Sequence, residues 1–109
     1  MREIRYAGFG FIVTRREVYE VLRERLQLPE CNQRFGQPMV PYFQPFAIPD
    51  GPGQWYLGED YSFCERARQC GFQVMADTRI RLWHVGSYSF SWEDAGSDKE
   101  RFATYAFKI

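Results

Sequence analysis

Apolar residues in the first quarter of the chain follow two spacings, one after the other. Over residues 8–13, Phe9, Phe11 and Val13 alternate with Gly8, Gly10 and Ile12, which predicts a buried strand. A helical spacing follows over residues 15–27, which predicts a helix that buries one stripe; its apolar residues are Val18, Val21, Leu22 and Leu26. Thr14 and Glu17 have the spacing of a capping box, whose side chains accept hydrogen bonds from free N–H groups of the first turn.

The second half of the chain shows a helical spacing first and strand patterns afterwards. Phe63, Ala67 and Cys70 recur at i, i+4 and i+7, so we expect a helix over residues 59–70 with Gly71 as its left-handed C-terminal cap. Strands are predicted at residues 72–76 and 80–85, joined by a turn at Asp77 and Thr78. A second capping box over residues 97–100 indicates a short C-terminal helix.

Between these halves lies a proline-rich segment, residues 29–57, which holds all six prolines of the chain. Proline fixes its own φ and favours extended structure in the residue before it, so no regular helix is expected there. The segment also contains aromatic residues at positions 42, 43, 46, 55 and 56, which favour an ordered loop that covers one mouth of a cleft. The predicted fold is therefore α+β in a single domain, residues 1–109, with one small mixed sheet and two or three helices. Its three blocks are 6–28, 29–57 and 58–109.

Composition narrows the functional classes. With 45% hydrophobic and 18% aromatic residues, the 109-residue chain can bury a core, and disorder is not expected. The formal net charge is zero, so neither nucleic acid nor an anionic membrane is an expected partner. Three cysteines and a single histidine lack the spacing of a structural zinc site. No apolar run has the length of a membrane span, and free cysteines suit a reducing compartment, so we expect a cytoplasmic location.

Glu59 and Asp60 are the first candidates for chemistry. They fall in the first turn of the predicted helix, where the helix dipole favours their ionised forms. An ionised carboxylate beside a loop-rich cleft can take the proton of a sugar hydroxyl. Acids also occur in first turns simply because they complement the dipole, and that reading stays open. His84, in the second predicted strand, is open to two readings in the same way: a metal ligand or a hydrogen-bonded core residue.

The combination of these residues resembles the C-terminal, acceptor-side part of GT-A-fold, family 2-type glycosyltransferases. The resemblance rests on residues 56–64 (YLGEDYSFC), Gly71–Phe72 and His84-Val85-Gly86, and more generally on residues 8–13 with the helix that follows. In that family a Glu-Asp element opens a helix, a Gly-aromatic strand comes next, and a later strand ends in histidine. The resemblance covers residues 6–92.

The family implies a role for each matching position. Asp60 would be the catalytic base, and Glu59 would orient the acceptor sugar. Trp55 and Tyr56 would stack on sugar faces, with Arg66 as a further substrate-binding residue. His84 would complete a Mn²⁺ or Mg²⁺ site on the donor diphosphate, where the metal neutralises the leaving group.

The sequence departs from the family in one important respect. It contains no Asp-x-Asp element and no phosphate-binding glycine-rich loop. The expected function is therefore binding of a carbohydrate or small ligand without turnover by the chain alone, with metal bound only if a partner supplies the other ligands. Two alternatives stay open: one chain of a two-chain glycosyltransferase, or a self-associating structural module. We expect a homodimer. Its candidate contacts are Phe9, Phe11, Ile12, Tyr88, Phe90 and Trp92.

Overall fold

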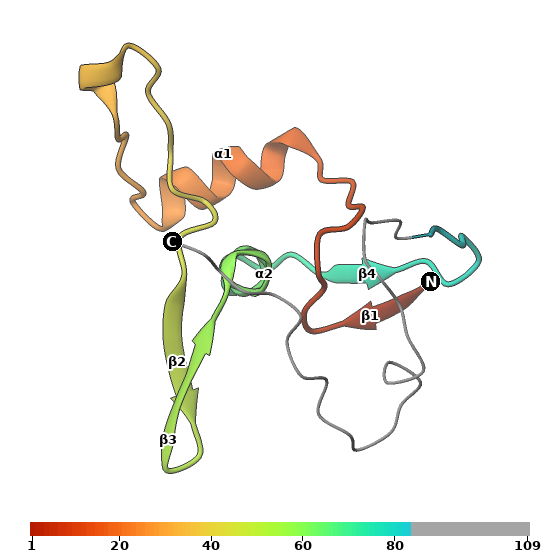
Figure 1. The fold of residues 1–109 in the computed structure, drawn as a ribbon. Helices are drawn as coiled ribbons and strands as arrows, with labels where there is room; N and C mark the ends of the chain where they lie inside the picture. Colours follow the sequence, from red (N-terminus) through yellow and green to blue (C-terminus); the bar gives the residue numbers. More distant parts are fainter. Residues whose placement is uncertain (84–109) are drawn as a thin grey trace, which may run out of the picture.

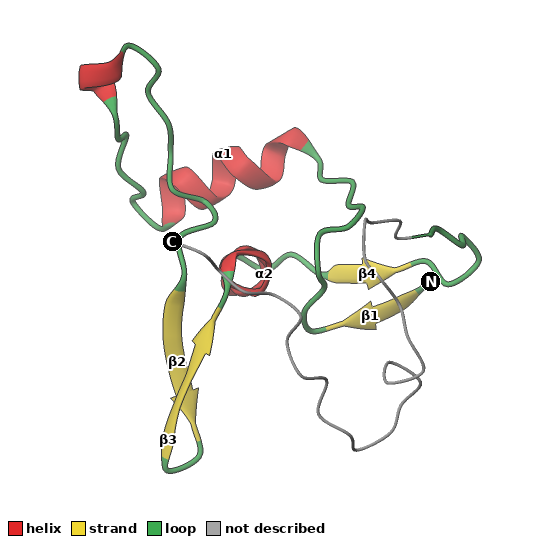
Figure 2. Ribbon diagram, viewed as in Figure 1, coloured by secondary structure: helices red, strands yellow, loops and turns green. Residues whose placement is uncertain are grey.

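The computed structural model describes residues 1–83, which form a small α+β fold (Figures 1 and 2). In chain order the elements are β1 (Arg2–Ile4), α1 (Arg16–Arg25), a 3-10 turn (Gln33–Phe35), β2 (Phe46–Asp50), β3 (Gly53–Leu57), α2 (Glu59–Gln69) and β4 (Val74–Ala76). The α+β class is as predicted. The predicted single mixed sheet is wrong, because the described strands form two antiparallel pairs, β1 with β4 and β2 with β3.

The core lies where α1 and α2 cross. Figure 1 shows α1 lengthwise and α2 nearly end-on, so the helices cross at a steep angle. The apolar stripes predicted for both helices meet there, and each fully buried aliphatic or aromatic side chain contributes about 1.5–3 kcal/mol. The buried cluster consists of Val18, Leu22, Phe63, Ala67 and Cys70.

The C-terminal cap of α2 is the one that the sequence predicts. Gly71 has a φ of +87°, its N–H donates to the Arg68 carbonyl at 3.0 Å, and the N–H of Phe72 reaches the Ala67 carbonyl at 3.0 Å. These two bonds form a Schellman motif, which satisfies carbonyls left free at the helix end. Arg25 of α1 adds a third donor, because its guanidinium bonds the Cys70 carbonyl at 3.0 Å.

The capping box predicted for α1 is wrong. The N-cap residue is Arg15, one position later than predicted, and no side chain caps the helix. Glu17 is drawn into an ion pair with Arg15 at 3.0 Å, so its carboxylate does not bond the backbone at the helix start. Exposed ion pairs of this kind contribute little to stability.

The strand predicted at residues 8–13 is wrong as well. These residues form an irregular segment in which Phe9 turns inward and packs edge-on against Phe43 and Phe63. The partner of β4 is instead β1, with Ile4 opposite Val74. The strand predicted at residues 72–76 is confirmed over Val74–Ala76, as β4. Residues 80–83 form no strand, whereas the rest of that predicted strand, including His84, and the predicted C-terminal helix lie outside the described residues.

The proline-rich segment contains a hairpin that the sequence interpretation missed. β2 and β3 pair in register from Phe46 opposite Leu57 to Asp50 opposite Gly53, and a two-residue turn joins them. Gly51 supplies the positive φ of this turn, +56°. Pro49 is tolerated within β2 because that strand has a single partner among the described strands. In Figure 1 the hairpin extends away from the helices.

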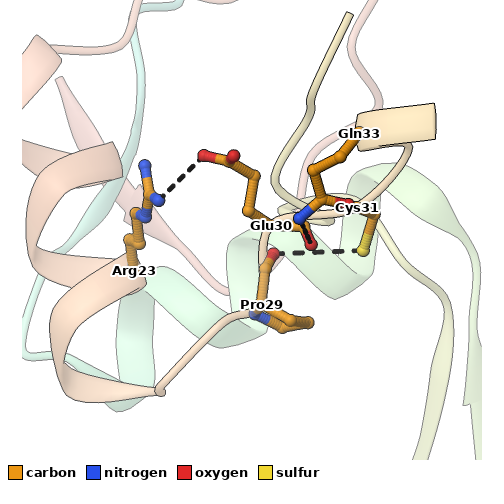
Figure 3. A network of polar contacts seen from close by, with 5 residues as sticks. All are labelled: Arg23, Pro29, Glu30, Cys31 and Gln33. Atoms are coloured by element: carbon orange, nitrogen blue, oxygen red, sulfur yellow. Dashed lines mark hydrogen bonds and ion pairs between the residues drawn. The ribbon is translucent and has the colours of Figure 1, made fainter. Parts of the chain in front are cut away.

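Polar contacts hold the start of the same segment at the end of α1 (Figure 3). Arg23 pairs with Glu30 at 3.2 Å, and the Gln33 side-chain amide donates to the Glu30 carbonyl at 2.7 Å. The Cys31 thiol lies 4.0 Å from the Pro29 carbonyl. Cys31 and Met39 form an isolated antiparallel β-bridge through their backbones. This bridge closes the loop that contains the 3-10 turn.

Candidate functional site

A concavity of about 560 Å³ lies where β3 passes into α2. Only Gly58 separates the last residue of the strand from the first residue of the helix, so strand-end aromatics and first-turn acids are forced to be neighbours. Four of the five site residues predicted within residues 1–83 therefore come together here. The lining residues are Pro45, Trp55, Tyr56, Gly58, Glu59, Asp60 and Tyr61.

The two acids have different surroundings. Oδ2 of Asp60 accepts a hydrogen bond from the backbone N–H of Phe9 at 3.0 Å, and Asp60 is half-buried. Glu59 is exposed. Asp60 is therefore the better oriented of the two, with one oxygen fixed by the 8–10 segment and the other, Oδ1, without a hydrogen bond in the described chain. A carboxylate held in this way can accept a ligand hydroxyl without first losing its own orientation.

The aromatic part of the site is a cluster of three rings, formed by Tyr6, Trp55 and Tyr61. Tyr6 stacks on Tyr61, with ring centroids 5.0 Å apart and planes 20° apart, and meets Trp55 edge-on at 5.3 Å. Trp55 and Tyr61 also meet edge-on, at 6.1 Å. Tyr56 stands apart from this cluster and is 70% exposed. An exposed aromatic ring with a polar tip can contact both the apolar and the polar parts of a ligand.

Arg66 is not at this site. It is only 8% exposed, and its Nη1 donates to the carbonyls of Tyr42 and Gln44 at 3.0 and 2.7 Å. Its guanidinium also lies 4.7 Å from the centre of the Phe46 ring. The substrate-binding role expected of Arg66 is therefore corrected to a structural one: it holds the chain just before β2 against α2.

Metal ligands were expected at His84, which lies outside the described residues. Within residues 1–83, no group of three or more His, Cys, Asp or Glu side chains could hold a metal ion. Glu59 and Asp60 are the acids that the described part of the site offers.

Within residues 1–83, no helix combines the length and the apolar character needed to cross a membrane.

A second hollow, of about 530 Å³, lies between the 12–15 segment, α2 and β4. Its walls include core residues such as Val18, Phe63 and Phe72, so it is mainly apolar. Cys64 also lines it, but burial raises the pKa of the Cys64 thiol, with a further contribution from the negative charge of Asp60. A thiol of this kind is a poor nucleophile at neutral pH.

Sequence reasoning missed two members of the aromatic cluster. Tyr61 could have been found, because it follows Asp60 directly. Tyr6 could not have been found from the sequence, since it is 49 positions before Trp55 and lies beside it only in the folded chain.

No protein-family model matches the chain, and neither a curated protein nor a solved structure matches it.

Proposed function

We propose that this concavity binds a carbohydrate and that the chain is a glycosyltransferase-like, acceptor-side module. The observation that carries the proposal is the meeting of an oriented carboxylate, Asp60, with Trp55 and Tyr56 in one concavity. A sugar ring has apolar C–H faces and a rim of hydroxyls. Aromatic rings cover the faces, and carboxylate oxygens accept hydrogen bonds from the rim.

Each contact has an expected strength. Removal of the Tyr56 ring costs a contact of about 1 kcal/mol, or roughly fivefold in affinity. Hydrogen bonds to charged groups contribute about 1.5–3 kcal/mol, so Asp60→Asn should weaken binding by at least about tenfold. The amide oxygen of the asparagine can still accept the N–H of Phe9, so this variant keeps the local fold.

The proposal is tested by titrating the ¹⁵N-labelled chain with glucose, galactose, mannose, N-acetylglucosamine, maltose and lactose. We expect at least one sugar to shift the Trp55 indole and Tyr56 amide signals, and Tyr56→Ala to weaken that response. Phe35→Ala is the matched control, because Phe35 is equally exposed, 69%, and lies in the 3-10 turn away from the site. If no sugar moves these signals up to about 50 mM, at which a millimolar Kd would be saturated, the proposal is wrong.

In a transfer reaction, the free oxygen of Asp60 would take the acceptor proton while a nucleotide-binding part holds the donor. The sequence has no Asp-x-Asp element, and a divalent metal on a donor diphosphate needs ligands beyond the two acids of this site. The chain is therefore proposed to act in transfer only together with a donor-binding partner.

Self-association is a second candidate function, and one observation favours it. Phe11 and Val13 are 69% and 83% exposed, and Val13 borders the apolar hollow. Exposed apolar side chains next to an apolar hollow are typical of association surfaces. Phe9 does not belong to this surface, because it packs against Phe43 and Phe63, and the other expected contacts, Tyr88, Phe90 and Trp92, lie outside the described residues.

Sedimentation equilibrium at micromolar concentration tests the homodimer. We expect a dimer mass for the parent and a monomer mass for Phe11→Ser. A monomer mass for the parent contradicts self-association and leaves the sugar-binding proposal unaffected.

A further inference from the structure

Tyr6 does not line the concavity, yet it contacts two residues that do. Its ring stacks on Tyr61 and supports Trp55 edge-on, at centroid distances of 5.0 and 5.3 Å. Contacts of this geometry contribute about 0.5–1.5 kcal/mol each beyond the burial of area. Tyr6 therefore forms a support behind the aromatic wall of the site.

The Tyr6 ring is itself fixed at its far end. Its hydroxyl donates to Oε2 of Glu65 at 2.6 Å, and the same oxygen pairs with Arg68 at 3.2 Å. A hydrogen bond to an ionised carboxylate is shorter and stronger than one between neutral groups. The Arg5 and Arg68 guanidinium carbons lie 5.1 and 5.8 Å from the ring centre, within the range of cation–π attraction. The tyrosine is thus held through its hydroxyl, its edges and its face.

Trp55 depends on this support more than an ordinary strand residue would. It belongs to a two-stranded hairpin, and an isolated hairpin is marginally stable. Its side chain remains 36% exposed, and Tyr6 and Tyr61 are the two rings that pack against it in the described chain. The orientation of the indole is therefore set by Tyr6 of the 1–9 segment together with Tyr61 of α2, rather than by the hairpin alone.

We propose that Tyr6 is a positioning residue of the sugar site, whose ring, anchored on Glu65, fixes the Trp55 indole in the orientation that a sugar face packs against. The inference rests on the proposed function for its ligand, but the orientation of Trp55 can be measured without any ligand. Tyr6 itself touches no ligand in this arrangement.

The test uses the full chain with Trp83→Phe and Trp92→Phe, so that Trp55 is the one tryptophan left of three. Tyr6→Phe keeps the ring and removes the hydroxyl, whereas Tyr6→Leu removes both. We expect the acrylamide quenching constant of Trp55 to rise by about half in Tyr6→Phe and to double in Tyr6→Leu. Sugar affinity should fall about threefold in Tyr6→Phe and about tenfold in Tyr6→Leu. Glu65→Gln keeps a neutral acceptor for the Tyr6 hydroxyl, so its effect should be smaller than that of Tyr6→Phe.

Tyr19→Leu is the matched control. Tyr19 packs against Tyr42 and Phe63 in the core, so its loss should lower the melting temperature without changing the quenching of Trp55. Unchanged quenching of Trp55 in Tyr6→Phe and in folded Tyr6→Leu overturns the inference. Equal sugar affinity in these variants, with altered quenching, overturns it too. If the parent binds no sugar while quenching responds to Tyr6, the proposed function fails but the positioning of Trp55 by Tyr6 stands.

Discussion

Replacing Arg66 by methionine should destabilise the fold without changing the site directly. The guanidinium is buried, donates to two backbone carbonyls at 3.0 and 2.7 Å, and lies 4.7 Å from the Phe46 ring centre. Hydrogen bonds from a charged donor contribute about 1.5–3 kcal/mol each, and the cation–π contact about 0.5–1 kcal/mol. Methionine keeps most of the aliphatic volume and removes the cost of burying a charge, which offsets part of this loss. The expected decrease in the free energy of unfolding is about 3 kcal/mol.

Urea denaturation followed by far-ultraviolet circular dichroism measures this decrease. Arg66→Lys keeps the charge, but its side chain is one atom shorter and it has no planar guanidinium over the Phe46 ring, so it should lose about half as much. Arg23→Met is the control, since the Arg23 side chain is 50% exposed and its ion pair with Glu30 should contribute less than about 1 kcal/mol. The reasoning is refuted if the free energy of unfolding of Arg66→Met is within 0.5 kcal/mol of that of the parent, because two hydrogen bonds from a charged, buried donor should not be lost at so small a cost. If Arg66→Met lost sugar affinity while its free energy of unfolding stayed that of the parent, the substrate-binding role expected of Arg66 would be supported after all.

Three further predictions concern a cap, a tyrosine and turnover. Gln27 follows α1 with a φ of 52°, so Gln27→Gly should raise the free energy of unfolding by about 0.5–1 kcal/mol in urea; a decrease contradicts this. Burial, and then the bond to Glu65, raises the pKa of Tyr6 above its ordinary 10.0. The melting temperature should therefore be steady below pH 10 and should fall as the pH rises towards the pKa of Tyr6 in the folded state. The fall should be less steep in Tyr6→Phe; equal slopes of melting temperature against pH in the two proteins contradict this. The chain with Mn²⁺ should not hydrolyse UDP-glucose, and turnover that Asp60→Asn abolishes would overturn that expectation.

The helices could be predicted from the sequence because their signals are local. Val18 and Leu22 in α1, and Phe63 and Ala67 in α2, mark the buried stripes by spacing alone. The cap at Gly71 is also local, since a left-handed residue after the last apolar position has few alternatives to glycine. The start of α1 was misplaced by one residue because Glu17 has a competing partner next to it, and pairing of exposed charges is not encoded by spacing.

The strands were predicted less well because their pairing is not local. β1 and β4 have three residues each, which is too short for an alternation of apolar and polar residues to be recognised, and they lie about 70 positions apart in the sequence. The alternation over residues 8–13 does not mark a buried face, because Phe9 packs inward whereas Phe11 and Val13 are exposed. The N–H of Phe9 donates to Asp60 instead of to a neighbouring strand. The β2–β3 hairpin did have a sequence signal, because glycines at positions 51 and 53 mark its turn. The prolines of the same segment led instead to the prediction of an irregular loop.

Asp60 connects the site to the fold, and this decides how its chemistry must be tested. Its Oδ2 accepts the N–H of Phe9 and so holds the 8–10 segment, while Asp60 also lines the concavity together with Trp55. Asp60→Ala would therefore remove a structural bond and the proposed ligand contact together, and any loss of binding would be ambiguous. Asp60→Asn keeps an acceptor for the N–H and replaces a charged oxygen by an amide. A loss of sugar affinity in Asp60→Asn at unchanged melting temperature therefore belongs to the charge, and the charge is what an acceptor-side base requires.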